Sequence, residues 1–171
     1  MLKIELKNIK HAQFASEETH CYNATLYVEG EKWGEVSNEG RGGPDHFHGV
    51  AGKSWDDIKA LNERIAAEYP KIDCTDIGAP GDFLDQNLET VCGELVNEFL
   101  VAKDLQRALK KAVLFYKAKP EAKGAPLYEI KLKGKAWDAR MEGLMQKNHP
   151  GAIILNALPI AEALPLYRMA G

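Results

Sequence analysis

Residues 81–120 read GDFLDQNLETVCGELVNEFLVAKDLQRALKKAVLFYKAKP, and this stretch keeps one hydrophobic period for longer than any other part of the 171-residue chain. Its apolar side chains recur every three or four positions, which is the spacing of one face of an α-helix. They are Leu84, Leu88, Val91, Leu95, Ala102, Leu105, Leu109, Ala112 and Tyr116, with Phe99 beside the slot that Glu98 breaks. The pattern predicts one long amphipathic helix against which the rest of the chain packs.

The ends of this helix are also predicted from local signals. Asp82 is the expected N-cap, with Asp85 three residues further on, and Pro120 is expected to end the helix. A helix over residues 82–119 would be about 55 Å long, whereas a compact domain of this size is about 40 Å across. The helix is therefore expected to bend, to break into two core segments, or to protrude and be covered by a second copy in a homodimer.

Alternating apolar and polar residues predict three strands in the first part of the chain, at residues 2–10, 21–29 and 32–38. The glycine-containing connection at residues 29–31 joins the last two as a hairpin, which gives a three-stranded antiparallel meander. Residues 39–49 are too rich in glycine and proline to be regular.

Helical spacing returns at residues 54–69, where Ser54 and Asp57 form a capping-box pattern. After Pro120, a strand at 127–133, a helix at 135–148 and a strand at 152–155 predict a β-α-β segment, in which the two strands run parallel. A short turn of helix is expected near residues 159–164. The fold class is therefore α+β, in a single domain over residues 1–171.

Three cysteines stand far apart, at Cys21, Cys74 and Cys92, with neither a zinc spacing nor a disulfide framework. This usage is typical of a reducing compartment. The first residues alternate like a strand and lack the apolar run of a signal peptide, and no segment approaches about 18 uninterrupted apolar residues. We therefore expect a cytoplasmic protein without a membrane span.

Charge is divided along the chain. Residues 1–102 carry 9 Lys and Arg against 19 Asp and Glu, a net of −10, whereas residues 103–140 carry 11 against 4, a net of +7. The exposed positions expected to form a positive binding surface are Lys103, Arg107 and Lys110 on the long helix and Lys131 and Lys133 on one face of a strand. Such a surface could track a nucleic-acid backbone or an acidic protein, or it could be a solvated face that balances the acidic part of its own fold or of a second subunit.

Strand register brings most of the histidines together. If Val28 faces Trp33, partner positions sum to 61 and His20 lies opposite Arg41. If the first two strands also pair, His11 lies beside His20. The edge where the glycine-rich loop departs would then gather several functional side chains, namely His11, His20, Cys21, Arg41, Asp45, His46 and His48.

Three interpretations of this edge stay open. In the first, His46 and His48 bind a transition metal, with His11, His20 or Asp45 completing the ligands. In the second, Arg41 and glycine amides hold an anion while His46, next to Asp45, acts as general base. In the third, the loop is a shaped turn whose glycines adopt positive φ and whose histidines are ordinary surface residues.

The absence of a recognisable catalytic motif favours a small, non-enzymatic binding protein for a macromolecular partner, either nucleic acid or an acidic protein, contacted through the basic block 103–140. The alternative is a small enzyme or metal-binding protein with its site at the histidine- and glycine-rich edge, residues 40–49.

Overall fold

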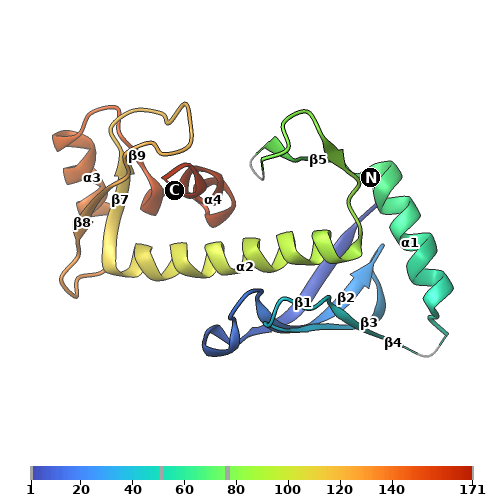
Figure 1. Ribbon diagram of the computed structural model, residues 1–171. Helices are drawn as coiled ribbons and strands as arrows, with labels where there is room; N and C mark the ends of the chain where they lie inside the picture. Colours follow the sequence, from blue (N-terminus) through green and yellow to red (C-terminus); the bar gives the residue numbers. More distant parts are fainter. Residues whose placement is uncertain (1, 51, 76–77, 171) are drawn as a thin grey trace. The chain divides into compact units, whose positions relative to one another are not determined.

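The computed structural model describes residues 2–50, 52–75 and 78–170, and it confirms an α+β fold (Figure 1). The chain forms two compact units, residues 1–98 and residues 99–171. The single domain over residues 1–171 that the sequence indicates stays a prediction.

The N-terminal unit contains a four-stranded antiparallel sheet in the order β1-β2-β3-β4. The strands are β1 (Ile4–His11), β2 (Cys21–Val28), β3 (Glu31–Glu39) and β4 (His46–Gly49), and the 3₁₀ turn η1 (Gln13–Ala15) lies between β1 and β2. The predicted meander is confirmed, but the prediction that residues 39–49 are irregular is wrong for β4. Phe47 pairs with Val36 and satisfies the free edge of β3, which would otherwise leave backbone groups unpaired.

The predicted register of the β2–β3 hairpin is wrong. Val28 pairs with Glu31 rather than with Trp33, and at the other end Cys21 pairs with Glu39. From the Cys21–Glu39 pair to the Leu26–Gly34 pair, the residue numbers of the two partners sum to 60. The predicted sum is 61, so the register differs from the prediction by one residue. A one-residue slip exchanges the two faces of a strand, so it changes which side chains of β3 face the core.

Turn chemistry explains the register. Glu29 and Gly30 both have positive φ, 52° and 82°, which is the geometry of a two-residue type I′ turn. A bulge then shifts the pairing between Leu26 and Tyr27, because Trp33 has no direct partner on β2. Neither feature can be deduced from the alternation of apolar residues.

Helix α1 (Trp55–Glu68) follows the sheet and confirms the predicted helix at 54–69. Ser54 is its N-cap, and its backbone N–H donates to the Asp57 carboxylate at 2.7 Å while its hydroxyl accepts from the Asp57 N–H at 3.4 Å. The helix buries one face, Ile58, Leu61 and Ile65. A short antiparallel pair, β5 (Ile72–Asp73) and β6 (Phe83–Leu84), precedes the next helix.

Helix α2 (Leu88–Lys111) has 24 residues, so the predicted helix over 82–119 is too long at both ends. Its start is fixed by a reciprocal cap between Asn87 and Thr90, whose backbone N–H groups each donate to the other's side chain at 2.9 Å; Asp82 is not the cap. At its other end the chain continues as a buried strand, which local helical spacing does not distinguish from a helix face.

That strand, β7 (Ala112–Tyr116), is buried at all five positions and forms the centre of the C-terminal unit. It lies between β8 (Tyr128–Lys131) and β9 (Ile153–Ile154), and both pair with it in antiparallel fashion. Helix α3 (Ala139–Asn148) connects β8 to β9. The β-α-β order is thus confirmed, and the two outer strands run parallel, with β7 between them.

The core of this unit has two sides because successive side chains of β7 point to opposite faces of the sheet. One side packs Leu114 and Tyr116 with Leu105 of α2, with Leu155 of the 3₁₀ turn η3 (Leu155–Ala157) and with α4 (Ile160–Tyr167). The other side packs Val113, Phe115, Leu132, Met145 and Ile154. The chain closes with the 3₁₀ turn η4 (Arg168–Ala170).

Candidate functional site

The N-terminal unit contains a polar cavity of about 410 Å³. It lies between the inner face of β2 and β3, the loop at residues 12–20 and the first turns of α2. Its walls include Glu17, Glu18, His20, Tyr22, Asp45 and Glu89. We call this the polar cavity.

Asn38 is the centre of the hydrogen bonding around the polar cavity, and only 7% of it is exposed. Its amide nitrogen donates to the Gly43 carbonyl and to Asp45 Oδ1, both at 3.0 Å. Its amide oxygen accepts from the Thr19 hydroxyl and from the Gly40 N–H, both at 2.8 Å. All four hydrogen-bonding positions of the amide are used, so this one side chain ties the loop before β2 to the loop after β3.

Tyr22 holds the second oxygen of the same carboxylate. Its hydroxyl donates to Asp45 Oδ2 at 2.5 Å, in the range of a charge-assisted hydrogen bond. Burial raises the pKa of Tyr22 well above its usual value, and the hydrogen bond to Asp45 raises that pKa further. Tyr22 is therefore a neutral donor, and Asp45 has a fixed orientation because both of its oxygens are held.

Cys92 of α2 is fully buried, and it interacts electrostatically with the carboxylates of Asp45 and Glu89. Burial raises the pKa of the Cys92 thiol, and the negative charges of Asp45 and Glu89 raise that pKa further. A thiol held neutral in this way is not a nucleophile. The chemistry of the polar cavity is consequently that of carboxylates and neutral hydrogen-bond donors.

Gly40 shows why glycine is needed in the loop after β3. Its φ is +85°, and an added Cβ would lie 2.1 Å from the carbonyl oxygen of Ala15. The carbonyl of Gly40 accepts from the N–H groups of Glu17 and Glu18, both at 2.9 Å. Gly40 therefore contacts the backbone of the loop at residues 12–20, which carries the carboxylates of Glu17 and Glu18.

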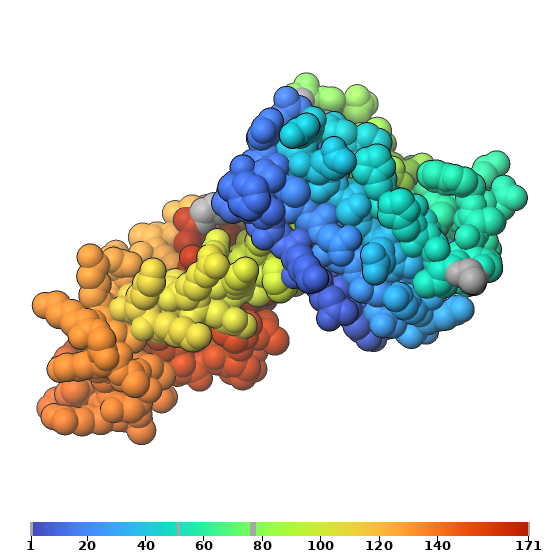
Figure 2. Space-filling view, turned by 90° about the horizontal axis from the view of Figure 1, so that it is seen from below, coloured from blue at the N-terminus to red at the C-terminus, as the bar shows by residue number. Residues whose placement is uncertain are grey.

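The four histidines of the predicted edge fall into two separate places. The rings of His11 and His20 are 5.4 Å apart, edge to face, as the sequence predicts for neighbours. His46 and His48 are exposed on β4, on the outer face of the sheet, which faces the viewer in Figure 2. Among the described residues, no group of three or more His, Cys, Asp or Glu side chains could hold a metal ion.

The three residues considered for catalysis are also placed differently. Asp45 extends to the inner face of the sheet, where it contacts Tyr22, whereas His46 pairs with Ser37 on the outer face. Arg41 is exposed in the loop between β3 and β4. Within the described part of the chain, no hydrogen bond or ion pair joins the side chains of these three residues to one another. The enzymatic interpretation stays a hypothesis.

The basic residues of the C-terminal unit, Lys103, Arg107, Lys110, Lys131 and Lys133, are all exposed. The end of α2 and the end of β8 lie side by side, because the Leu132 N–H donates to the Lys111 carbonyl at 2.8 Å. The structure thus brings Lys110 close to Lys131 and Lys133 along the backbone. We call the surface of Lys110, Lys131 and Lys133 the basic corner.

Lys133 lies in a tight turn and not on the strand as predicted. Lys133 and Gly134 have φ of 51° and 81°, and the Lys135 N–H donates to the Leu132 carbonyl at 3.0 Å. Across residues 2–50, 52–75 and 78–170, the three lysines of the basic corner take part in no ion pair. Their ammonium groups are available to an external anion.

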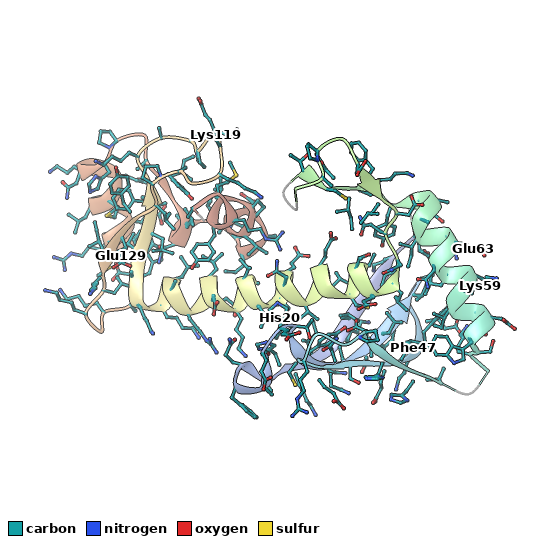
Figure 3. The ribbon with its side chains drawn as sticks, in the orientation of Figure 1. His20, Phe47, Lys59, Glu63, Lys119 and Glu129 are labelled. Atoms are coloured by element: carbon teal, nitrogen blue, oxygen red, sulfur yellow. The ribbon has the colours of Figure 1, made fainter. Side chains whose placement is uncertain are left out.

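Arg107 and Lys103 differ from the basic corner. Arg107 pairs with Asp104 at 3.3 Å, and Lys103 lies 5.8 Å from the ring of Phe99. A hollow of about 380 Å³ beside them is lined by Arg107 and Lys111 but equally by Asp104 and Glu129; Glu129 is labelled in Figure 3. Since its charges balance, this hollow is a poor site for a small anion.

Sequence reasoning missed Tyr22, Asn38 and Glu89. The correct register would have indicated Asn38, because it follows buried Val36 by two positions and so shares its face.

No family model matches the chain, and neither a curated protein nor a solved structure is significantly similar to it. No helix in the described part of the chain is long and apolar enough to cross a membrane.

Proposed function

We propose that the protein binds nucleic acid through the phosphate backbone, using the basic corner of the C-terminal unit. The observation that carries this proposal is that the net charge changes sign at the boundary between the two compact units. Residues 1–98 hold 9 Lys and Arg against 19 Asp and Glu, a net of −10, whereas residues 99–171 hold 13 against 6, a net of +7. A compact unit with this excess of positive charge attracts polyanions.

The chemistry of the surface favours the backbone over the bases. Tyr116 and Phe115 are buried, and Tyr128 is stacked on Phe115 and covered by the ammonium group of Lys117 at 4.4 Å. Within the described part of the C-terminal unit, the exposed large apolar residues are Ile130 and Leu144, neither of which is aromatic. Without a stacking platform, binding is expected to be independent of sequence and sensitive to salt.

The test is fluorescence anisotropy with a labelled DNA duplex of about 20 base pairs in about 50 mM NaCl. The Lys131→Gln/Lys133→Gln variant removes two charges from the basic corner. The matched control, Lys119→Gln/Lys123→Gln, removes two charges from the loop at the opposite end of the β7–β8 hairpin (Figure 3). The proposal predicts a loss of affinity of about tenfold for the first variant and less than about twofold for the control.

Two outcomes would contradict the proposal. Equal losses in both variants would mean that only the overall charge of the unit matters and that the basic corner is not the contact surface. Failure of the wild-type protein to bind the duplex would leave an acidic protein as the partner of the positive unit and would overturn the nucleic-acid proposal.

A further inference from the structure

A second cavity of about 260 Å³ adjoins the polar cavity in the N-terminal unit, because Asp45 and Glu89 line both. The second cavity is mainly apolar. Its walls include Val36, Pro44, Phe47, Trp55 and Ile58. His20 and Phe47, labelled in Figure 3, come from the walls of the polar and the apolar cavity respectively. The two cavities therefore meet at Asp45 and Glu89, and we call them together the groove, with a polar and an apolar part.

Trp55 is the most informative residue of the apolar part. It is the first residue of α1, and 80% of it is exposed although it lines the apolar cavity. Exposed tryptophan beside an apolar hollow is typical of an anchor for a partner protein. Phe14, 94% exposed, follows Gln13 in the wall of the polar cavity. The groove thus has an exposed aromatic side chain near each part.

The charge of the groove is entirely negative. Glu17, Glu18, Asp45 and Glu89 line it, and no lysine or arginine among the described residues does so. In that same part of the chain, these four carboxylates take part in no ion pair. Carboxylates that share a cavity repel one another, and a cation between them relieves this repulsion.

Asp45, at the junction of the two parts, is already oriented for binding. Tyr22 and Asn38 each donate to one of its oxygens, at 2.5 Å and 3.0 Å. A carboxylate oxygen accepts more than one hydrogen bond, so both can still accept from a ligand. A fixed acceptor lowers the entropy that binding costs.

We propose that this groove binds a basic segment of a partner protein that also carries an apolar side chain. The ammonium or guanidinium groups of the segment contact Asp45 and Glu89, and its apolar side chain enters the hollow beside Trp55. A free polyamine would satisfy the carboxylates but would leave the apolar part empty. This inference uses residues of the N-terminal unit only and is independent of the nucleic-acid proposal.

The probe is a fluorescein-labelled decapeptide of alternating lysine and leucine, titrated against the full chain by anisotropy. Two further peptides separate the contributions: alternating lysine and serine lacks the apolar side chains, and alternating glutamate and leucine reverses the charge. The proposal predicts saturable binding of the first peptide, binding about tenfold weaker for the second, and none for the third.

Variants then place the peptide in the groove. Trp55→Ala and Glu89→Gln are each expected to weaken binding about tenfold. Their matched controls are Phe83→Ala, another exposed aromatic residue, on β6, and Glu63→Gln, an exposed residue of α1. Neither residue lines the groove. The controls are expected to change affinity by less than about twofold.

Three results would overturn the proposal. The first is a loss of affinity in the control variants equal to that in the groove variants. The second is spermine binding as tightly as the lysine and leucine peptide and independently of Trp55, which would indicate a polyamine site. The third is a wild-type dimer in native mass spectrometry that Trp55→Ala converts to monomer, which would mean that the groove holds a second copy of this chain.

Discussion

The two units place their polar residues in opposite ways. In the N-terminal unit, Tyr22, Asn38 and Asp45 turn inward and fix one another by hydrogen bonds. In the C-terminal unit, the interior on both sides of β7 is almost entirely apolar, and the charged residues lie outside, with Lys131 and Lys133 unpaired in the described structure. The first arrangement suits the proposed selection of a ligand by shape, whereas the second suits the proposed attraction of a polyanion by charge.

The largest expected effect tests whether the units are independent. Leu155 is fully buried in the core of the C-terminal unit, so Leu155→Ala is expected to lower its free energy of unfolding by about 4 kcal/mol. Hydrogen exchange is expected to show lost protection in β7 and β8 with β1–β4 unchanged, and the half-exposed control Leu144→Ala is expected to change little. An equal loss of protection in β1–β4 would show one cooperative domain, as the sequence predicts.

The next effect concerns the polar residues that face the interior of the N-terminal unit. Asn38→Ala removes a side chain that makes four hydrogen bonds and leaves buried partners unsatisfied. We expect a loss of about 3 kcal/mol in urea unfolding. The neighbouring Ser37 faces the other side of β3, and Ser37→Ala is expected to cost less than about 0.5 kcal/mol. Similar effects of the two substitutions would refute the central role of Asn38.

A smaller effect depends on pH. Tyr22→Phe removes the hydrogen bond to Asp45, which is expected to cost about 2 kcal/mol near neutral pH. The folded pKa of Tyr22 lies above the unfolded value, so its contribution is complete below about pH 10 and falls by about 1.4 kcal/mol per pH unit above that. Other groups with raised pKa values, such as Cys92, titrate in both proteins. Parallel stability profiles above pH 10 would contradict this account.

How much the sequence predicts depends on how local the signal is. The start of α1 is predicted correctly because Ser54 and Asp57 are three residues apart and make the cap themselves. The end of α2 is missed because Ala112 and Tyr116 keep helical spacing while belonging to a buried strand. Burial on both faces of a strand comes from distant segments, and no local pattern specifies it.

The candidate sites divide in the same manner. The basic corner is largely predictable, since its lysines are close in sequence and charge is visible in composition; only the turn at Lys133 is not. The groove is not predictable, because Glu17, Asp45 and Glu89 come from three segments that the sheet and α2 bring together. The error of one residue in the predicted β2–β3 register was enough to hide the inward position of Asn38.

The most direct test of the central claim is the salt dependence of duplex binding. For contacts to three or four phosphates, the logarithm of the association constant is expected to fall with the logarithm of NaCl concentration with a slope of about −3. The Lys131→Gln/Lys133→Gln variant is expected to have a slope of about −1, and Lys119→Gln/Lys123→Gln to keep the wild-type slope. A slope that is the same in all three proteins would contradict the assignment of the basic corner as the phosphate-binding surface.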